Sequence, residues 1–219
     1  MSTGSVGETC GSANPNGIFP EAMRHSFTTS EVAAGYLPPL RPAPRWHSRI
    51  APVVTPRGLR ELYDHHAWSM GALLTHAGEV TQEQAEAMPW KGVASLEDTL
   101  THIITAERYW LANWQGKERP HFDWPESIAE VSDHWMALQA ETRAFLADVE
   151  EDELGRMLEL RQPIGGGRET LAAGIMHVLL HAAQHRAEAA VLLSDCGRSP
   201  GELDYIDFLE HREALLRIR

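Results

Sequence analysis

Three histidines recur at four-residue intervals toward the end of the chain, at His177, His181 and His185. In a helix, residues four apart share one face, so His181 and His185 can direct two imidazoles at a single point. Both border the apolar stripe of this segment, whereas His177 turns further toward solvent. Because imidazole is the commonest metal ligand, the pair indicates half of a metal site.

A third ligand is expected from an upstream helix. His102 lies at the margin of its own apolar stripe, four residues after Asp98, whose carboxylate could hydrogen-bond the imidazole and hold one tautomer. His102, His181 and His185 would supply three neutral nitrogen donors and leave positions open for water or substrate, as in a catalytic metal site. The alternative is that these histidines are surface or packing residues without a metal.

Two further titratable residues fall on apolar stripes. Glu107 lies close to the middle of the stripe that follows His102, and His66 lies near the centre of an earlier one. A buried carboxylate needs a partner, so Glu107 is either a functional acid or base or half of a structural pair with an arginine such as Arg186. His66 is expected to line the pocket or to support the ligands. Either residue is a candidate for moving a proton.

Long helices must carry these side chains. Apolar residues repeat at helical spacing in four stretches, each with a start or stop signal: residues 55–78, 95–116, 127–149 and 169–196. A short hairpin is expected around residues 157–168, and a short amphipathic helix closes the chain. Four long amphipathic helices with at least one long connection predict an all-α four-helix bundle.

The chain divides into a proline-rich N-terminal extension, residues 1–54, and a bundle domain, residues 55–219. Prolines cluster before residue 57, and no helical or alternating pattern is sustained there, so we expect a flexible, disordered tail. The opening residues lack the basic start and apolar run of a secretory signal, so export is not expected. Met23 is an alternative initiator.

Composition excludes several classes of protein. With 219 residues and 43% hydrophobic residues, the chain suits one globular domain plus an extension. Its net charge of −12 disfavours nucleic-acid binding through a basic face. No apolar run is long enough to span a membrane. Cys10 and Cys196 are too few for a disulfide framework and indicate a reducing, cytoplasmic setting.

A distinctive set of residues completes the pattern. The set is Tyr63, Ala67-Trp68-Ser69 and Leu73-Leu74 in the first helix, His102 and Glu107-Arg108-Tyr109-Trp110 in the second, His177-Val178, His181 and His185-Arg186 in the last long helix, and Leu203-Asp204-Tyr205-Ile206 after it. Over about residues 57–208 the chain thereby resembles the DinB/YfiT-like superfamily of damage-inducible proteins.

The resemblance implies a four-helix bundle, often dimeric, that holds a divalent metal such as zinc, nickel, iron or manganese with three histidines. The ligand positions match His102, His181 and His185, and His177 matches a position that is often histidine but not normally a ligand. Met70 departs from the pattern, because many relatives carry asparagine there. Studied relatives include thiol-dependent transferases and isomerases that use bacillithiol or mycothiol.

The leading hypothesis is a cytoplasmic metal-dependent enzyme that acts on a small molecule. Its metal would activate water or the thiol of an external low-molecular-weight cofactor, which gives a hydrolase or a thiol S-transferase. Glu107 and His66 are the catalytic candidates. The alternative is a non-enzymatic stress-response protein, DNA-damage inducible as the family name implies, with a structural or sensing metal site. A homodimer is expected, and neither nucleic acid nor membrane is an expected partner.

Overall fold

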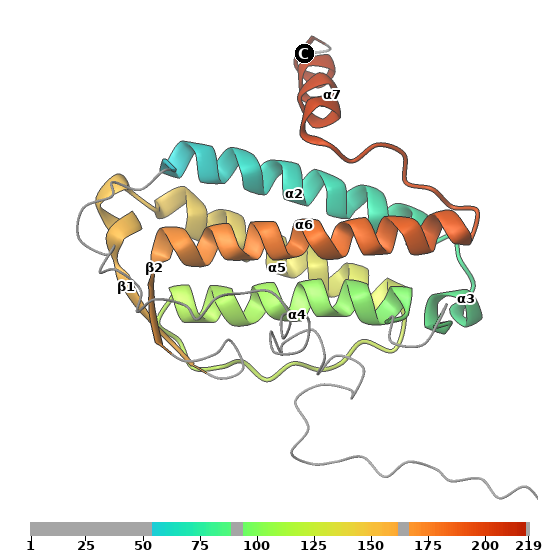
Figure 1. Cartoon of the computed structure of the whole chain (residues 1–219), viewed down its shortest axis with the longest axis horizontal. Coiled ribbons are helices and arrows are strands. Elements are labelled where there is room, and N and C mark those ends of the chain that lie inside the picture. The colour runs from blue at the N-terminus through green and yellow to red at the C-terminus, as the bar shows by residue number, and fades with distance from the viewer. Residues whose placement is uncertain (1–53, 89–93, 162–166, 218–219) are drawn as a thin grey trace, which may run out of the picture. The chain divides into compact units, whose positions relative to one another are not determined.

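The computed structural model describes residues 54–88, 94–161 and 167–217, and the predicted N-terminal extension lies almost wholly outside them (Figure 1). Its elements follow in the order α2 (Pro56–Ala77), α3 (Gln82–Glu86), α4 (Leu96–Trp114), α5 (Ile128–Asp148), the 3₁₀ helix η2 (Glu151–Gly155), β1 (Met157–Leu160), β2 (Gly167–Thr170), α6 (Leu171–Asp195) and α7 (Tyr205–Arg217).

The four long helices form the predicted bundle. In Figure 1, α6 lies in front of α5, and α2 and α4 flank it. Helix α6 packs against α2 and α4, and α5 packs against the same two helices. The all-α four-helix bundle expected from the sequence is therefore confirmed. None of the helices described is long and apolar enough to cross a membrane.

Local capping explains where the helices begin. The hydroxyls of Thr55, Ser95 and Ser127 each accept the backbone N–H three residues on, as the sequence predicted at these starts. Helix α6 begins at Leu171, slightly later than expected, and Thr170 is its N-cap. Each cap satisfies a backbone donor that the first turn leaves open.

Two short features lie between the long helices. The predicted hairpin is present, with β1 and β2 antiparallel and Met157 opposite Thr170, although its turn lies outside the described residues. Helix α3 was not predicted. Thr81 and Gln84 form a capping box for it, and its single buried residue, Ala85, packs against the core. Five residues are too short for an apolar period to be visible in the sequence.

The core holds the large apolar side chains of all four long helices. Trp114, Trp135 and Met70 are almost completely buried. Met70, the position that departs from the family pattern, is thus a packing residue here. Gly174 lets α6 approach α4 closely, since a Cβ there would stand 3.0 Å from Trp114 Nε1 and 3.1 Å from Trp110.

Helix α7 projects from the bundle (Figure 1). Its one buried residue is Phe208, which contacts the rings of His65 and Trp68 on α2. The Tyr205 hydroxyl donates to Glu61 Oε1 at 2.6 Å. The predicted C-terminal helix is therefore present and is attached through its first turns.

Candidate metal centre

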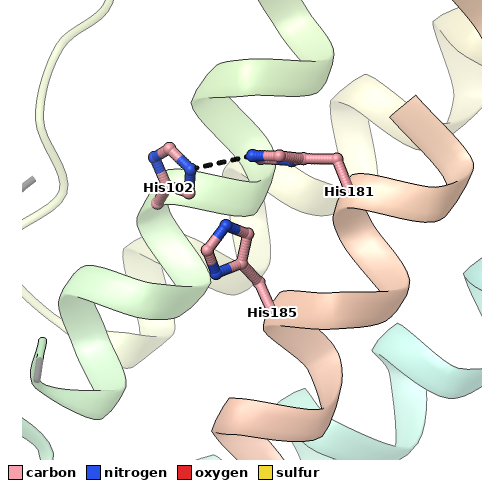
Figure 2. A group of neighbouring side chains, drawn as sticks. All are labelled: His102, His181 and His185. Carbon is pink, nitrogen blue, oxygen red and sulfur yellow. Dashed lines mark hydrogen bonds between the residues drawn. The ribbon is translucent and has the colours of Figure 1, made fainter. Parts of the chain in front are cut away.

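Three histidines from two facing helices converge at one point (Figure 2). His102 extends from α4, and His181 and His185 extend from consecutive turns of α6. One ring nitrogen from each lies within 4.8 Å of the other two. The ring centroids stand 4.5–5.0 Å apart. The structure thus brings together all three residues that the sequence singled out as ligands.

The donor set fits a divalent transition metal. The Nε2 atoms of His102 and His181 are 3.2 Å apart. Two nitrogens that each bind one Zn²⁺ at about 2.0–2.1 Å lie roughly 3.0–3.4 Å apart, depending on the coordination angle. Three imidazoles suit zinc, nickel and iron better than calcium or magnesium. The residues present therefore match the metal that the sequence led us to expect, without selecting one element.

Burial keeps the imidazoles of His102 and His181 neutral. It lowers the pKa of His102 to about 4, with a smaller contribution from neighbouring His185. Burial also lowers the pKa of His181 to about 3, helped by the three other histidines around it. A metal ligand must offer a free lone pair, so proton competition at these two rings is weak near neutral pH.

A carboxylate that the helical pattern did not single out contacts His185, the third candidate ligand. His185 Nδ1 and Glu188 Oε2 are 2.6 Å apart, and the Gln184 amide donates to the other carboxylate oxygen at 3.4 Å. The available signal was the three-residue spacing from His185 on a helix, which places the two side chains side by side. The expected contact between Asp98 and His102 stays a prediction.

His177 lies beside the cluster but outside the group of candidate ligands. It is exposed, as its position beyond the apolar stripe predicted. Its ring stacks on His181, with centroids 5.7 Å apart, and lies 5.0 Å from the Trp110 ring. His177 therefore covers one side of His181.

Glu107 and His66 belong to a buried polar network. Glu107 Oε1 accepts from the Tyr63 hydroxyl at 2.7 Å and from the Thr142 hydroxyl at 2.9 Å. Its Oε2 lies 3.0 Å from His66 Nε2. The far nitrogen of His66 accepts from Arg186. Glu107 and His66 are buried, as their positions on the apolar stripes predicted. Arg186, the arginine named as one possible partner of Glu107, reaches it through the imidazole of His66.

In this network burial lowers the pKa of the basic groups, and the neighbouring carboxylate of Glu107 raises it again. Burial lowers the pKa of His66, against the pull of Glu107. It lowers the pKa of Arg186 to about 10, and the carboxylate of Glu107 limits the fall. Because Arg186 directly follows His185, one end of the network lies next to a candidate metal ligand.

The class of protein is a four-helix bundle with a cluster of three histidines between α4 and α6. The DinB family model matches residues 54–215, and the chain belongs to the DinB family. It is similar in fold to a DinB-like protein of known crystal structure from Bacillus cereus ATCC 10987, with 18% sequence identity and a TM-score of 0.58. The match covers 70% of this chain and 99% of that one. No protein of curated function matches the chain.

Proposed function

We propose that this chain is a metal-dependent enzyme that transfers an external low-molecular-weight thiol to a small electrophilic molecule, with hydrolysis as the other reaction type. The observation that carries the proposal is the convergence of His102, His181 and His185 within 4.8 Å. Three protein ligands leave coordination positions for a nucleophile, which is typical of catalytic rather than structural metal sites.

When bound, the metal would act as a Lewis acid and lower the pKa of a coordinated water or thiol. The protein contributes the arrangement. His102 and His181 offer neutral nitrogens on facing helices, and His185 is held by Glu188. In a transfer, the thiol sulfur forms a bond to carbon, the leaving group departs with its electron pair, and the thiol proton is released.

The described residues offer no cysteine beside the three histidines, so we propose that the thiol comes from outside the chain. Among the described residues, Cys196 is the only cysteine, and it caps the C-terminal end of α6. It lies eleven positions after His185, which is about 16 Å along a helix. This distance supports an external thiol over an internal nucleophile.

Glu107 and His66 are the proposed carriers of the released proton. The support is that they are two buried titratable groups in hydrogen-bond contact, in a network that ends at Arg186, the residue after His185. A carrier role predicts that Glu107→Gln changes the pH profile of turnover. If Glu107→Gln lowers stability but leaves the pH profile of the remaining activity unchanged, the network serves only to hold the helices.

The test is conjugation of chlorodinitrobenzene with bacillithiol, mycothiol, glutathione or cysteine by the metal-loaded protein. We expect turnover with at least one thiol, its loss in His102→Ala, and its retention in His177→Ala. Hydrolysis of ester or amide substrates without thiol would instead support the hydrolase. Bound metal without turnover in either assay would overturn the proposal of an enzyme and favour the alternative, a non-enzymatic stress-response protein. The cytoplasmic location and the homodimer stay predictions.

A further inference from the structure

We infer that Glu188 positions His185 for metal binding by holding its imidazole with the proton on Nδ1, so that Nε2 presents the lone pair. This inference rests on the three-histidine centre proposed above. It assigns a role to a residue outside the ligand set, on the exposed side of α6. Glu188 would not touch the metal, and it would act through His185.

The hydrogen bond fixes the tautomer. Glu188 Oε2 lies 2.6 Å from His185 Nδ1, and a carboxylate only accepts hydrogen bonds. Nδ1 must therefore carry the proton that is donated. In a neutral imidazole the other nitrogen, Nε2, then has the free lone pair. His185 thus offers one defined ligand atom instead of an interchangeable pair.

The surroundings fix the direction of the ring. His185 is buried, with 9% of its side chain exposed, and its ring stands edge-on to those of His102 and His181 at interplanar angles of 81° and 68°. A ring that is packed on two sides and bonded at Nδ1 has little freedom to rotate. Nε2 is held in the cluster as a result.

Glu188 is itself held on α6. Its second carboxylate oxygen accepts from the Gln184 amide one turn earlier, at 3.4 Å. Its side chain is 47% exposed, so one part of the carboxylate faces water while the other faces His185. Gln184, His185 and Glu188 therefore form one connected group on the helix surface.

Such a carboxylate contributes in two separable ways. It orients the ring and fixes the tautomer, and its negative charge makes the ligand nitrogen more basic. Glu188→Gln keeps an oxygen that can accept from Nδ1–H but removes the charge. Glu188→Ala removes both contributions. Glu213→Ala is the matched control, because Glu213 forms an exposed pair with Arg217 on α7 and carries the same charge.

The first readout needs no metal. In ¹⁵N-histidine NMR spectra of the metal-free protein, with His185 assigned by comparison with His185→Asn, we expect Nδ1 protonated in the wild type. We expect the same in Glu188→Gln and loss of this preference in Glu188→Ala. An unchanged His185 tautomer in Glu188→Ala would overturn the inference.

The second readout is Zn²⁺ affinity, measured by competition with a chelating dye. Removing such a supporting partner weakens metal binding about 10–100-fold, and we expect this for Glu188→Ala. If the Zn²⁺ affinity of Glu188→Gln is close to that of the wild type, the effect is due to orientation of the ring. If it is close to that of Glu188→Ala, the effect is due to the negative charge. Equal affinities in Glu188→Ala and Glu213→Ala would overturn the inference. Absence of metal from the wild type would overturn the proposed function, and the tautomer measurement would still decide the role of Glu188.

Discussion

Arg186 donates from its guanidinium to Nδ1 of His66, and this bond determines where the proton of that imidazole lies. Arginine has no acceptor, so Nδ1 must be unprotonated. The proton is then on Nε2, which faces Glu107 Oε2 at 3.0 Å. Burial lowers the pKa of His66, in agreement with a neutral ring. His66 is therefore a neutral bridge between a buried guanidinium and a buried carboxylate.

We expect Glu107→Gln to lower the free energy of unfolding by about 3–5 kcal/mol, because it leaves the charge of Arg186 buried without a counter-charge. Urea unfolding of the purified variant measures the loss. The matched control is Thr142→Val, which removes one hydrogen bond to the same carboxylate and keeps the side-chain shape. Its cost should be about 1 kcal/mol. Equal losses in the two variants would contradict the charge argument.

The sequence predicted features that depend on neighbours in the chain. Thr55, Ser95 and Ser127 cap helices through bonds to residues three positions on, so their role is local and visible in the order of residues. The alignment of His181 with His185 follows from the helical period alone. Placing His102 beside them needed one more assumption, that the helix of His102 faces the helix of His181 and His185. The structure confirms this assumption.

Other features depend on packing that a periodic pattern does not contain. His66 and Arg186 are 120 positions apart in the chain, so no spacing rule could pair them. Glu188 lies outside the apolar stripe of its helix, so the helical pattern did not single it out. Its contact with His185 depends on side-chain rotamers as well as on helical spacing. The sequence therefore pointed to the three candidate ligands more readily than to the residues that hold them.

Metal content tests the centre directly. We expect about one equivalent of a transition metal in protein purified without a histidine tag, and its loss in His185→Ala, because two remaining imidazoles bind weakly. Elemental analysis measures both. His177→Ala is the control: it removes an exposed neighbour of His181 that is not in the ligand group, and it should retain the metal. Equal metal loss in both variants would make His177 a ligand.

The stability of the metal-free protein should fall on acidification. In the folded state His102 has a pKa of about 4 and His181 of about 3, below the value of about 6.5 for an unfolded histidine. The unfolded chain then binds protons first, so the free energy of unfolding decreases as the pH falls from about 6.5 toward 4. The limiting slope is about 1.4 kcal/mol per pH unit for each histidine.

Urea unfolding of metal-free protein at several pH values between about 5 and 7 measures this slope. This range lies above the usual titration of carboxyl groups, so histidines dominate the change. The double variant His102→Gln, His181→Gln is the control, and its stability should depend less on pH in this window. A slope that the double variant leaves unchanged would assign the acid sensitivity to other histidines.

The attachment of α7 should depend on pH at both extremes. The bond from Tyr205 is the main cause that lowers the pKa of Glu61, and the same bond raises that of Tyr205. The contact is therefore present at neutral pH. It is lost as the pH falls through the lowered pKa of Glu61, and also as it rises through the raised pKa of Tyr205. The Trp68 indole resonance reports attachment, because its ring contacts Phe208.

Tyr205→Phe separates this contact from general unfolding. It removes the hydroxyl and keeps the ring, so we expect the Trp68 resonance at neutral pH to move toward its acid-state position while the bundle remains folded. Both groups are only partly buried at the surface, so the effect on global stability should be small. A Trp68 resonance that is identical in Tyr205→Phe and wild type across the pH range would show that Phe208 alone attaches α7.

The close approach of α6 to α4 should be essential for the metal centre. A methyl group at Gly174 would meet Trp114 Nε1 at 3.0 Å and Trp110 at 3.1 Å, and neither buried indole can move freely. We expect Gly174→Ala to cost about 1–3 kcal/mol of stability through overpacking. It should also weaken Zn²⁺ binding, because moving α6 away from α4 separates His181 from His102.

Gly71→Ala provides the matched control within α2, where the added methyl group meets nothing within 4 Å. Alanine is the better helix former by about 1 kcal/mol, so this variant should be slightly more stable than wild type and bind Zn²⁺ equally well. Urea unfolding and dye competition measure the two quantities on both variants. If Gly174→Ala also gains stability and keeps its Zn²⁺ affinity, the helix spacing at Gly174 does not set the distance between the ligands.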